Sequence, residues 1–179
     1  MSRLPIVGVM GSSEKDWDDY AVPLGRWLAT QPVHLLTGGG NGVMTSVSRA
    51  FTAVSPRPGL SIGCLPTEQE NGQFICRSNY PNPYVEIPIV TPLSINGLAG
   101  QPEDAITRNH VNILTANIVI ALPGSVGTKN EVELALQFKK PLVLFGPPDA
   151  FHDFAATARR LSALPDVQGW VVNQLKTRP

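Results

Sequence analysis

Residues 121–131 read ALPGSVGTKNE, and the chain on either side of them indicates how they fold. Before this stretch, the run from Asn117 to Leu122 is apolar and contains β-branched residues, which is typical of a buried strand. After it, apolar residues recur at helical spacing from Val132 to Phe138. The segment therefore predicts a strand, a glycine-containing loop and a helix, in that order.

This strand, loop and helix are suited to binding an anion. Gly124 and Gly127 allow a tight turn and let a ligand approach the backbone closely. The helix that follows offers unpaired N–H groups and the positive end of its dipole, so we expect an anionic group there, most simply a phosphate. A structural alternative stays open from the motif alone, because Thr128 and Glu131 have the T-x-x-E spacing of a helix capping box.

The composition indicates one globular domain over residues 1–179, with 42% hydrophobic and 16% charged residues. Fourteen basic residues balance fourteen acidic ones without a basic run, which disfavours nucleic acid as a partner but not a mononucleotide. No stretch has the length of a membrane span and the N-terminus does not resemble a signal peptide. We therefore expect a cytoplasmic protein with no membrane partner.

The cysteine and histidine residues imply no metal site. Cys64 and Cys76 lack the spacing of metal ligands, and the three histidines are scattered along the chain. Cys64 lies in an apolar run and is expected to be a small core residue.

The rest of the chain alternates apolar runs with amphipathic segments. The runs that predict strands are 6–10, 33–37, 60–65, 84–90 and 141–145. The segments that predict helices are 16–30, 43–54, 103–114 and 151–164. Two stretches without strand or helix periodicity, 67–83 and 91–101, are expected to be loops, and we interpret the first as covering a ligand.

This alternation predicts an α/β fold: one Rossmann-like, doubly wound parallel sheet with helices on both faces. Ligands of such sheets bind outside the carboxyl ends of the strands. Three glycine loops, at Gly11, 38–42 and 124–127, follow predicted strands and are therefore expected to meet there. That convergence favours a real anion site over a capping box alone. The residues expected to bind the ligand, all in these loops, are Gly11, Ser12, Gly39, Gly40, Asn41, Gly42, Gly124, Ser125, Gly127 and Thr128.

The motifs do not match the common nucleotide-binding loops. No G-x-x-x-x-G-K-[ST] occurs, and neither glycine loop reads G-x-G-x-x-G. Three features in order, GGGNGVM at 38–44, Arg108, and PGSVGTKNE at 123–131, instead resemble the lysine-decarboxylase-like, or LOG-like, superfamily. That superfamily includes cytokinin riboside 5′-monophosphate phosphoribohydrolases and molybdenum cofactor carrier proteins. Nothing in this chain resembles a pyridoxal-phosphate lysine site, so decarboxylation is not implied.

The resemblance assigns roles to two residues. In the phosphoribohydrolases the matching Arg and the motif Glu are the catalytic pair, which implies Arg108 and Glu131 here. A carboxylate can stabilise the positive charge that develops on a ribose as its glycosidic bond breaks. An Arg can bind phosphate or hold the Glu in place. The resemblance also implies a homo-oligomer, a dimer or a tetramer.

Three departures from the hydrolase pattern favour the carrier branch of the superfamily. Ser125 replaces a glycine, Asn109 replaces a lysine, and the motif at 38–44 is one residue short. We therefore expect a binding protein for a small phosphorylated ligand, either a pterin of the molybdenum cofactor type or a nucleotide, with no cofactor needed for catalysis. Two alternatives stay open: a nucleoside 5′-monophosphate phosphoribohydrolase, and a nucleotide sensor that does not cleave its ligand.

Overall fold

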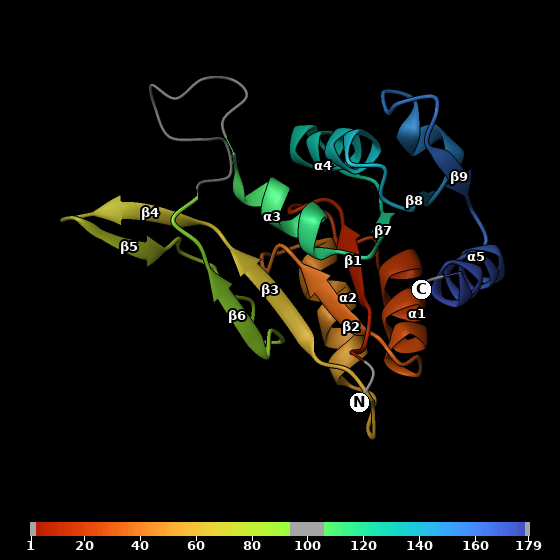
Figure 1. Cartoon of the computed structure of the whole chain (residues 1–179), viewed down its shortest axis with the longest axis horizontal. Helices are drawn as coiled ribbons and strands as arrows, with labels where there is room; N and C mark the ends of the chain where they lie inside the picture. The colour runs from red at the N-terminus through yellow and green to blue at the C-terminus, as the bar shows by residue number, and fades with distance from the viewer. Residues whose placement is uncertain (1–2, 94–105, 178–179) are drawn as a thin grey trace.

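The computed structural model describes residues 3–93 and 106–177, and within them seven parallel strands form the central sheet (Figure 1). These strands are β1 Ile6–Met10, β2 His34–Thr37, β3 Ser61–Leu65, β6 Ile87–Val90, β7 Ile118–Ala121, β8 Leu142–Phe145 and β9 Arg159–Leu161. Their order across the sheet is β6-β3-β2-β1-β7-β8-β9. The chain thus builds outward from β1 in one direction and then, from β7, in the other, so the strand order reverses between β1 and β7.

Helices cover both faces of this sheet, which confirms the predicted fold class. They are α1 Asp18–Ala29, α2 Val43–Thr52, α3 Arg108–Thr115, α4 Val126–Gln137 and α5 Leu164–Lys176. Helices α1, α2 and α5 pack on one face, and α3 and α4 pack on the other (Figure 1). Each face of the sheet has its own hydrophobic core, and alternate residues of a strand point into one or the other. Ile118 lies in the core beneath α1, α2 and α5, and Val119 lies in the core beneath α3 and α4, as expected for a strand buried on both sides.

The C-terminal region differs from the prediction. The helix expected over 151–164 is wrong: a 3-10 turn at Pro148–Phe151 and strand β9 occupy this region, and α5 follows. Phe151 and Phe154 have helical spacing, but Phe151 ends the 3-10 turn and Phe154 lies in the irregular segment after it. Both reach the core, where they meet edge to face with ring centroids 5.3 Å apart. Apolar residues buried from non-helical backbone therefore produced the same spacing in the sequence as one face of a helix.

The stretch 67–83 also differs from the prediction, because its first part is a hairpin. Strands β4 Thr67–Glu70 and β5 Gln73–Cys76 pair antiparallel and project from the edge of the central sheet (Figure 1). The turn between them has positive φ at both Asn71 (50°) and Gly72 (78°). An Asn-Gly pair with this backbone is the preferred two-residue hairpin turn, so the sequence did contain a signal for it.

Smaller differences occur at element ends. Strand β6 begins at Ile87, three residues later than predicted, and α1 begins at Asp18. Helix α3 begins at Arg108, after a capping box between Thr107 and His110, so Ile106 is not part of it. The acidic residues expected in the first turn of this helix, 103–104, and most of the loop at 91–101 lie outside the described residues. No helix in the described ranges is long and apolar enough to cross a membrane.

Candidate functional site

The three glycine loops meet at the carboxyl ends of β1, β2 and β7, as predicted. Ser12 joins them: its backbone N–H donates to the Pro123 carbonyl (3.1 Å), and its carbonyl accepts from the Val43 N–H (2.9 Å). Its side-chain oxygen accepts from the backbone N–H groups of Glu14 and Lys15. This junction lies where the strand order reverses, which is where doubly wound sheets bind their ligands.

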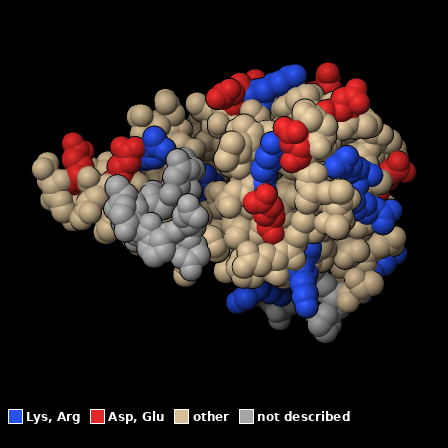
Figure 2. Space-filling model, turned by 90° about the horizontal axis from the view of Figure 1, so that it is seen from above, with Lys and Arg blue, Asp and Glu red and all other residues tan. Residues whose placement is uncertain are grey.

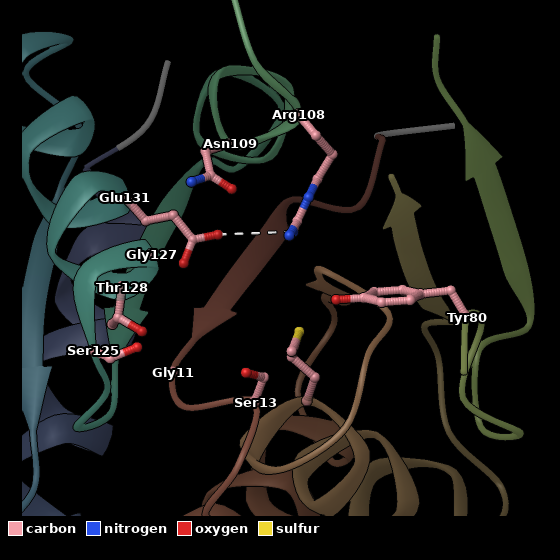
Figure 3. A pocket seen from close by; sticks show the side chains of 10 residues that line it. Gly11, Ser13, Tyr80, Arg108, Asn109, Ser125, Gly127, Thr128 and Glu131 are labelled. Atoms are coloured by element: carbon pink, nitrogen blue, oxygen red, sulfur yellow. Dashed lines mark ion pairs between the residues drawn. The ribbon is translucent and has the colours of Figure 1, made fainter. Parts of the chain in front are cut away.

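A pocket of about 90 Å³ opens at this junction (Figure 3). Six of its residues are ones that the sequence singled out, namely Gly11, Arg108, Ser125, Gly127, Thr128 and Glu131. Four more complete the lining, namely Ser13, Met44, Tyr80 and Asn109. The pocket therefore combines the start of α4, the start of α3, the loop after β1, the start of α2 and the segment before β6.

One wall of the pocket is the N-terminus of α4. The helix begins at Val126, and its N-cap residue Ser125 makes no side-chain hydrogen bond to the first turn. Thr128 lies in the first turn and Glu131 in the second, so the two do not form the capping box that their spacing allowed. A Cβ added to Gly127 would meet no atom within 4 Å, which leaves the start of this helix accessible.

Arg108 forms the opposite wall and is buried without full hydrogen bonding. Its residue exposure is 5%, and Nε and Nη1 have no hydrogen-bond partner among the described residues. Nη1 lies 3.9 Å from Oε1 of Glu131, which is an ion pair but too long for a hydrogen bond (Figure 3). A buried guanidinium with unpaired donors is costly, because those donors have lost water without gaining a partner. An anion in the pocket would supply the missing hydrogen-bond acceptor.

Glu131 completes the charged part of the site. Its Oε1 accepts a hydrogen bond from Nδ2 of Asn112 (3.2 Å), and Asn109 pairs with Asn130 beside it (3.0 Å). Burial raises the pKa of the Glu131 carboxyl, against smaller lowering effects of Arg108 and of the Asn112 hydrogen bond. Desolvation thus favours the neutral carboxyl, which can donate a hydrogen bond to a ligand.

Cys64 lies buried in β3, as expected, within the electrostatic reach of Arg108 and Glu131. Burial raises the pKa of its thiol to about 11, with a smaller opposing effect of Arg108. The neutral thiol is therefore a packing group and not a nucleophile. Among the described residues, no group of three or more His, Cys, Asp or Glu side chains could hold a metal ion.

The glycine loop at 38–42 does not line this pocket. Gly39 and Gly42 have positive φ, 74° and 64°, and a Cβ on Gly42 would overlap the Ser12 carbonyl oxygen. Gly38 lies against the Arg108 guanidinium, and a Cβ on Gly40 would come within 2.8 Å of the Tyr80 ring. These glycines therefore permit close packing behind the pocket.

Ser12, which was expected at the ligand, joins the loops without being part of the pocket lining, so its contact with a ligand stays a prediction. Two other residues expected at the ligand also lie away from the lining. Gly124 packs against Thr128 and the Ser12 N–H, where a Cβ would not fit. Asn41 is exposed and lines a neighbouring hollow together with Tyr80. A ligand contact for either residue stays a prediction.

Tyr80 is the pocket residue that was hardest to predict from the sequence. It belongs to the stretch 67–83, which we expected to cover a ligand, but no motif distinguished it from its neighbours. Met44 was expected in the core, and it is both buried, at 6% exposure, and part of the pocket lining. The face of the molecule seen in Figure 2 carries basic and acidic side chains interspersed, without a field of one sign.

The chain is similar to known proteins over nearly its whole length. The model of the SLOG cluster4 family matches residues 4–173. The molybdenum cofactor binding protein from Rippkaea orientalis is 31% identical, with a TM-score of 0.72 over 99% of this chain and 100% of that one. The molybdenum cofactor carrier protein from Chlamydomonas reinhardtii is 30% identical, with a TM-score of 0.70 over 98% and 100%. An uncharacterized protein from Archaeoglobus fulgidus is 24% identical over 148 residues, 82% of this chain and 83% of its own.

Proposed function

We propose, starting from the fact that this chain belongs to the SLOG cluster4 family, that it binds a phosphorylated pterin of the molybdenum cofactor type, or a nucleotide. The ligand's phosphate lies between the start of α4 and Arg108, at the carboxyl ends of β1 and β7. The observation that carries this proposal is the buried Arg108 guanidinium with two nitrogens that lack a hydrogen-bond partner among the described residues.

A phosphate matches what this wall of the pocket offers. Its oxygens are strong acceptors for a guanidinium and for backbone N–H groups, and its charge is favoured by the positive end of a helix dipole. Arg108 and the first turn of α4 line the same pocket, so one anion can contact both. Binding would also remove the cost of leaving the Arg108 donors unpaired.

Glu131 is compatible with a phosphate in this position. A charged carboxylate 3.9 Å from Arg108 would repel a phosphate and compete with it for the guanidinium. The pKa of Glu131 is raised by burial, which favours a neutral carboxyl. The raised pKa therefore reduces the repulsion that a phosphate would meet at Glu131, and the carboxyl in its protonated form can donate an O–H hydrogen bond to a phosphate oxygen.

The identity of the ligand is proposed from similarity. Both solved proteins at about 30% identity, over nearly their whole lengths, are described as binding or carrying the molybdenum cofactor. In this chain Asn109, which distinguishes the carrier-like motif from the hydrolase motif, is buried at 3% exposure and lines the pocket. The similarity to these two proteins, together with the place of Asn109 in the pocket, is our reason to propose a pterin first and a nucleotide second.

Calorimetric titration tests the proposal. Molybdopterin, the molybdenum cofactor and a panel of mononucleotides are titrated into the wild type, Arg108→Gln and the control Arg26→Gln, whose arginine is exposed on α1. We expect at least one phosphorylated ligand to bind the wild type and the control equally, and to bind Arg108→Gln at least tenfold more weakly. If none of these ligands binds the folded wild type, the proposal is wrong.

Hydrolysis of a nucleoside 5′-monophosphate is the second candidate, because Arg108 and Glu131 lie in one pocket as that chemistry requires. Its test is release of free base from AMP, lost in Glu131→Gln while phosphate binding persists. Intact ligand after long incubation with the wild type would exclude hydrolysis and leave a carrier or a sensor.

A further inference from the structure

The segment that precedes β6 is fastened to the glycine loop at 38–42. The backbone N–H of Asn82 donates to the Gly39 carbonyl (2.7 Å), and its side-chain Nδ2 donates to the Gly40 carbonyl (2.9 Å). Asn82 is 3% exposed and its Oδ1 accepts from the Tyr84 N–H (3.1 Å). A segment held in this way presents its side chains in a defined place, although it has no regular secondary structure.

Tyr80 is the side chain that this segment presents to the pocket. Its ring lies against Gly40, where an added Cβ would come 2.8–2.9 Å from three atoms of the phenol group. Figure 3 shows the hydroxyl pointing into the pocket, toward the wall that carries Ser125, Thr128 and Glu131. Gly40 therefore makes room for the ring, and the ring in turn forms the wall opposite α4.

The same ring also bounds a second, larger hollow of about 330 Å³. Its lining consists of Ser13, Asn41, Arg77, Ser78, Asn79 and Tyr80. Ser13 and Tyr80 line both spaces, so the hollow adjoins the pocket that contains Arg108 and Glu131. The inner pocket, of about 90 Å³, is smaller than the pockets of about 300–1,000 Å³ that hold whole organic ligands, so the rest of such a ligand must extend outside it.

The chemistry of the outer hollow suits an uncharged planar ring. Of its six residues only Arg77 is charged, and its Nε is paired with Oε1 of Glu68 at 2.6 Å. The amides of Asn41 and Asn79 both donate and accept hydrogen bonds, as the edge of a pterin or purine requires. A tyrosine ring offers a surface on which such a heterocycle can stack.

We infer that Tyr80, with Asn41, Ser78 and Asn79, forms the heterocycle subsite of this protein: a flat nitrogen heterocycle occupies the outer hollow against Tyr80 while its phosphate reaches Arg108. This inference rests on the proposed function and adds to it the residues that recognise the head group. Ser13, which lines both spaces, lies beside the linkage between the two parts of the ligand.

The test separates the two halves of the ligand with different probes. Molybdopterin, AMP and inorganic phosphate are titrated into the wild type, Tyr80→Ala, Tyr80→Phe and the control Tyr84→Ala, which removes a ring that lines neither space. We expect Tyr80→Ala to bind the heterocyclic probe on the order of tenfold more weakly, because a stacking surface is lost. Its affinity for inorganic phosphate should fall by a clearly smaller factor, because Arg108 and the start of α4 remain in place. Tyr80→Phe keeps the ring and should restore most of the affinity for the heterocyclic probe, and Tyr84→Ala should match the wild type.

A second variant tests whether the loss comes from the position of the Tyr80 ring and not from a wider disturbance of the fold by Tyr80→Ala. Gly40→Ala leaves Tyr80 in the chain but displaces its ring, so it should reproduce the selective loss. If Tyr80→Ala binds the heterocyclic probe as the wild type does, or loses affinity for phosphate to the same extent, the inference is wrong. The proposed function still stands in that case, provided that Arg108→Gln weakens binding as expected. If the folded wild type binds none of the three probes, both are wrong.

Discussion

The two glycine loops, 38–42 after β2 and 124–127 after β7, look alike in the sequence and differ in the structure. In the first loop each of the four glycines is held against a neighbour. The neighbours are Arg108 for Gly38, Leu65 for Gly39, Tyr80 for Gly40 and the Ser12 carbonyl for Gly42. In the second loop, Gly127 has no atom within 4 Å of the place that a Cβ would take. Glycine therefore serves close packing throughout the first loop, whereas the second loop has one closely packed glycine, Gly124, and one accessible glycine, Gly127.

Because of this difference, the two loops have different roles in the pocket. The first loop positions two side chains of the pocket, because it packs against the Arg108 guanidinium on one side and the Tyr80 ring on the other. The second loop leads into the start of α4, which lines the pocket where we propose that the phosphate binds. A substitution in the first loop, or at Gly124, should therefore affect stability and the position of side chains, whereas one at Gly127 should act mainly on ligand affinity.

Gly42→Ala should give the largest effect on stability. Gly42 has φ 64° and ψ −132°, a backbone conformation that other residues avoid, and a Cβ would also overlap the Ser12 carbonyl. We expect a loss of roughly 2–4 kcal/mol in the free energy of unfolding, measured by denaturant titration. Gly72→Ala is the control: it has φ 78° but open space, and should cost only about 1–2 kcal/mol. Equal losses in the two variants would show that packing at Gly42 contributes nothing.

Gly38→Ala should disturb the site more than the fold. Its Cβ would overlap Nη1 of Arg108 and approach Sδ of Met44 to 2.9 Å, so the guanidinium has to move. Overpacking of this kind costs roughly 1–3 kcal/mol, and we expect ligand affinity to fall about tenfold or more. Calorimetry with the ligand that binds the wild type, on protein shown to be folded, measures this. Unchanged affinity would mean that the position of Arg108 does not matter.

Glu131→Gln should change how stability depends on pH. The raised pKa of Glu131 means that the folded chain holds this proton more tightly than the unfolded chain does. Below the ordinary carboxyl pKa of about 4.3 both states are protonated, and as pH rises through the raised value the folded state loses stability. The variant lacks this loss, so its melting temperature relative to wild type should rise between pH 4 and pH 8. A difference that stays flat or falls would contradict the burial effect.

Gly127→Ala should have the smallest effect on stability and the opposite sign. Gly127 lies in the first turn of α4, where alanine is the better helix former and meets no atom. We expect a gain of up to about 1 kcal/mol in the free energy of unfolding, together with weaker ligand binding if the phosphate approaches this backbone closely. Denaturant titration and calorimetry on the same preparation measure the two effects. A clear loss of stability would contradict the accessible geometry of this loop.

The sequence predicted the sheet and the meeting of its loops because these depend on local patterns. Apolar runs such as Ile6–Met10 and Leu142–Phe145 can be satisfied only by burial, and parallel strands place the segments that follow them at one edge. Arg108 and Glu131 were predicted from a resemblance, and the structure places Nη1 and Oε1 3.9 Å apart.

The features that the sequence did not predict depend on contacts between distant segments. Tyr80 enters the pocket because Asn82 binds the carbonyls of Gly39 and Gly40, about forty residues earlier in the chain, and no local pattern encodes that. Similarly, Phe151 and Phe154 are buried through the tertiary packing of a loop, which periodicity alone cannot distinguish from a helix.

The most direct test of the account is to identify the small molecules that freshly purified protein releases on denaturation, by mass spectrometry. The account predicts an intact phosphorylated pterin or nucleotide from the wild type and from Arg26→Gln, and far less of it from Arg108→Gln. Wild-type protein that releases no such molecule, and that does not take one up when it is added back, would contradict a phosphate site at Arg108.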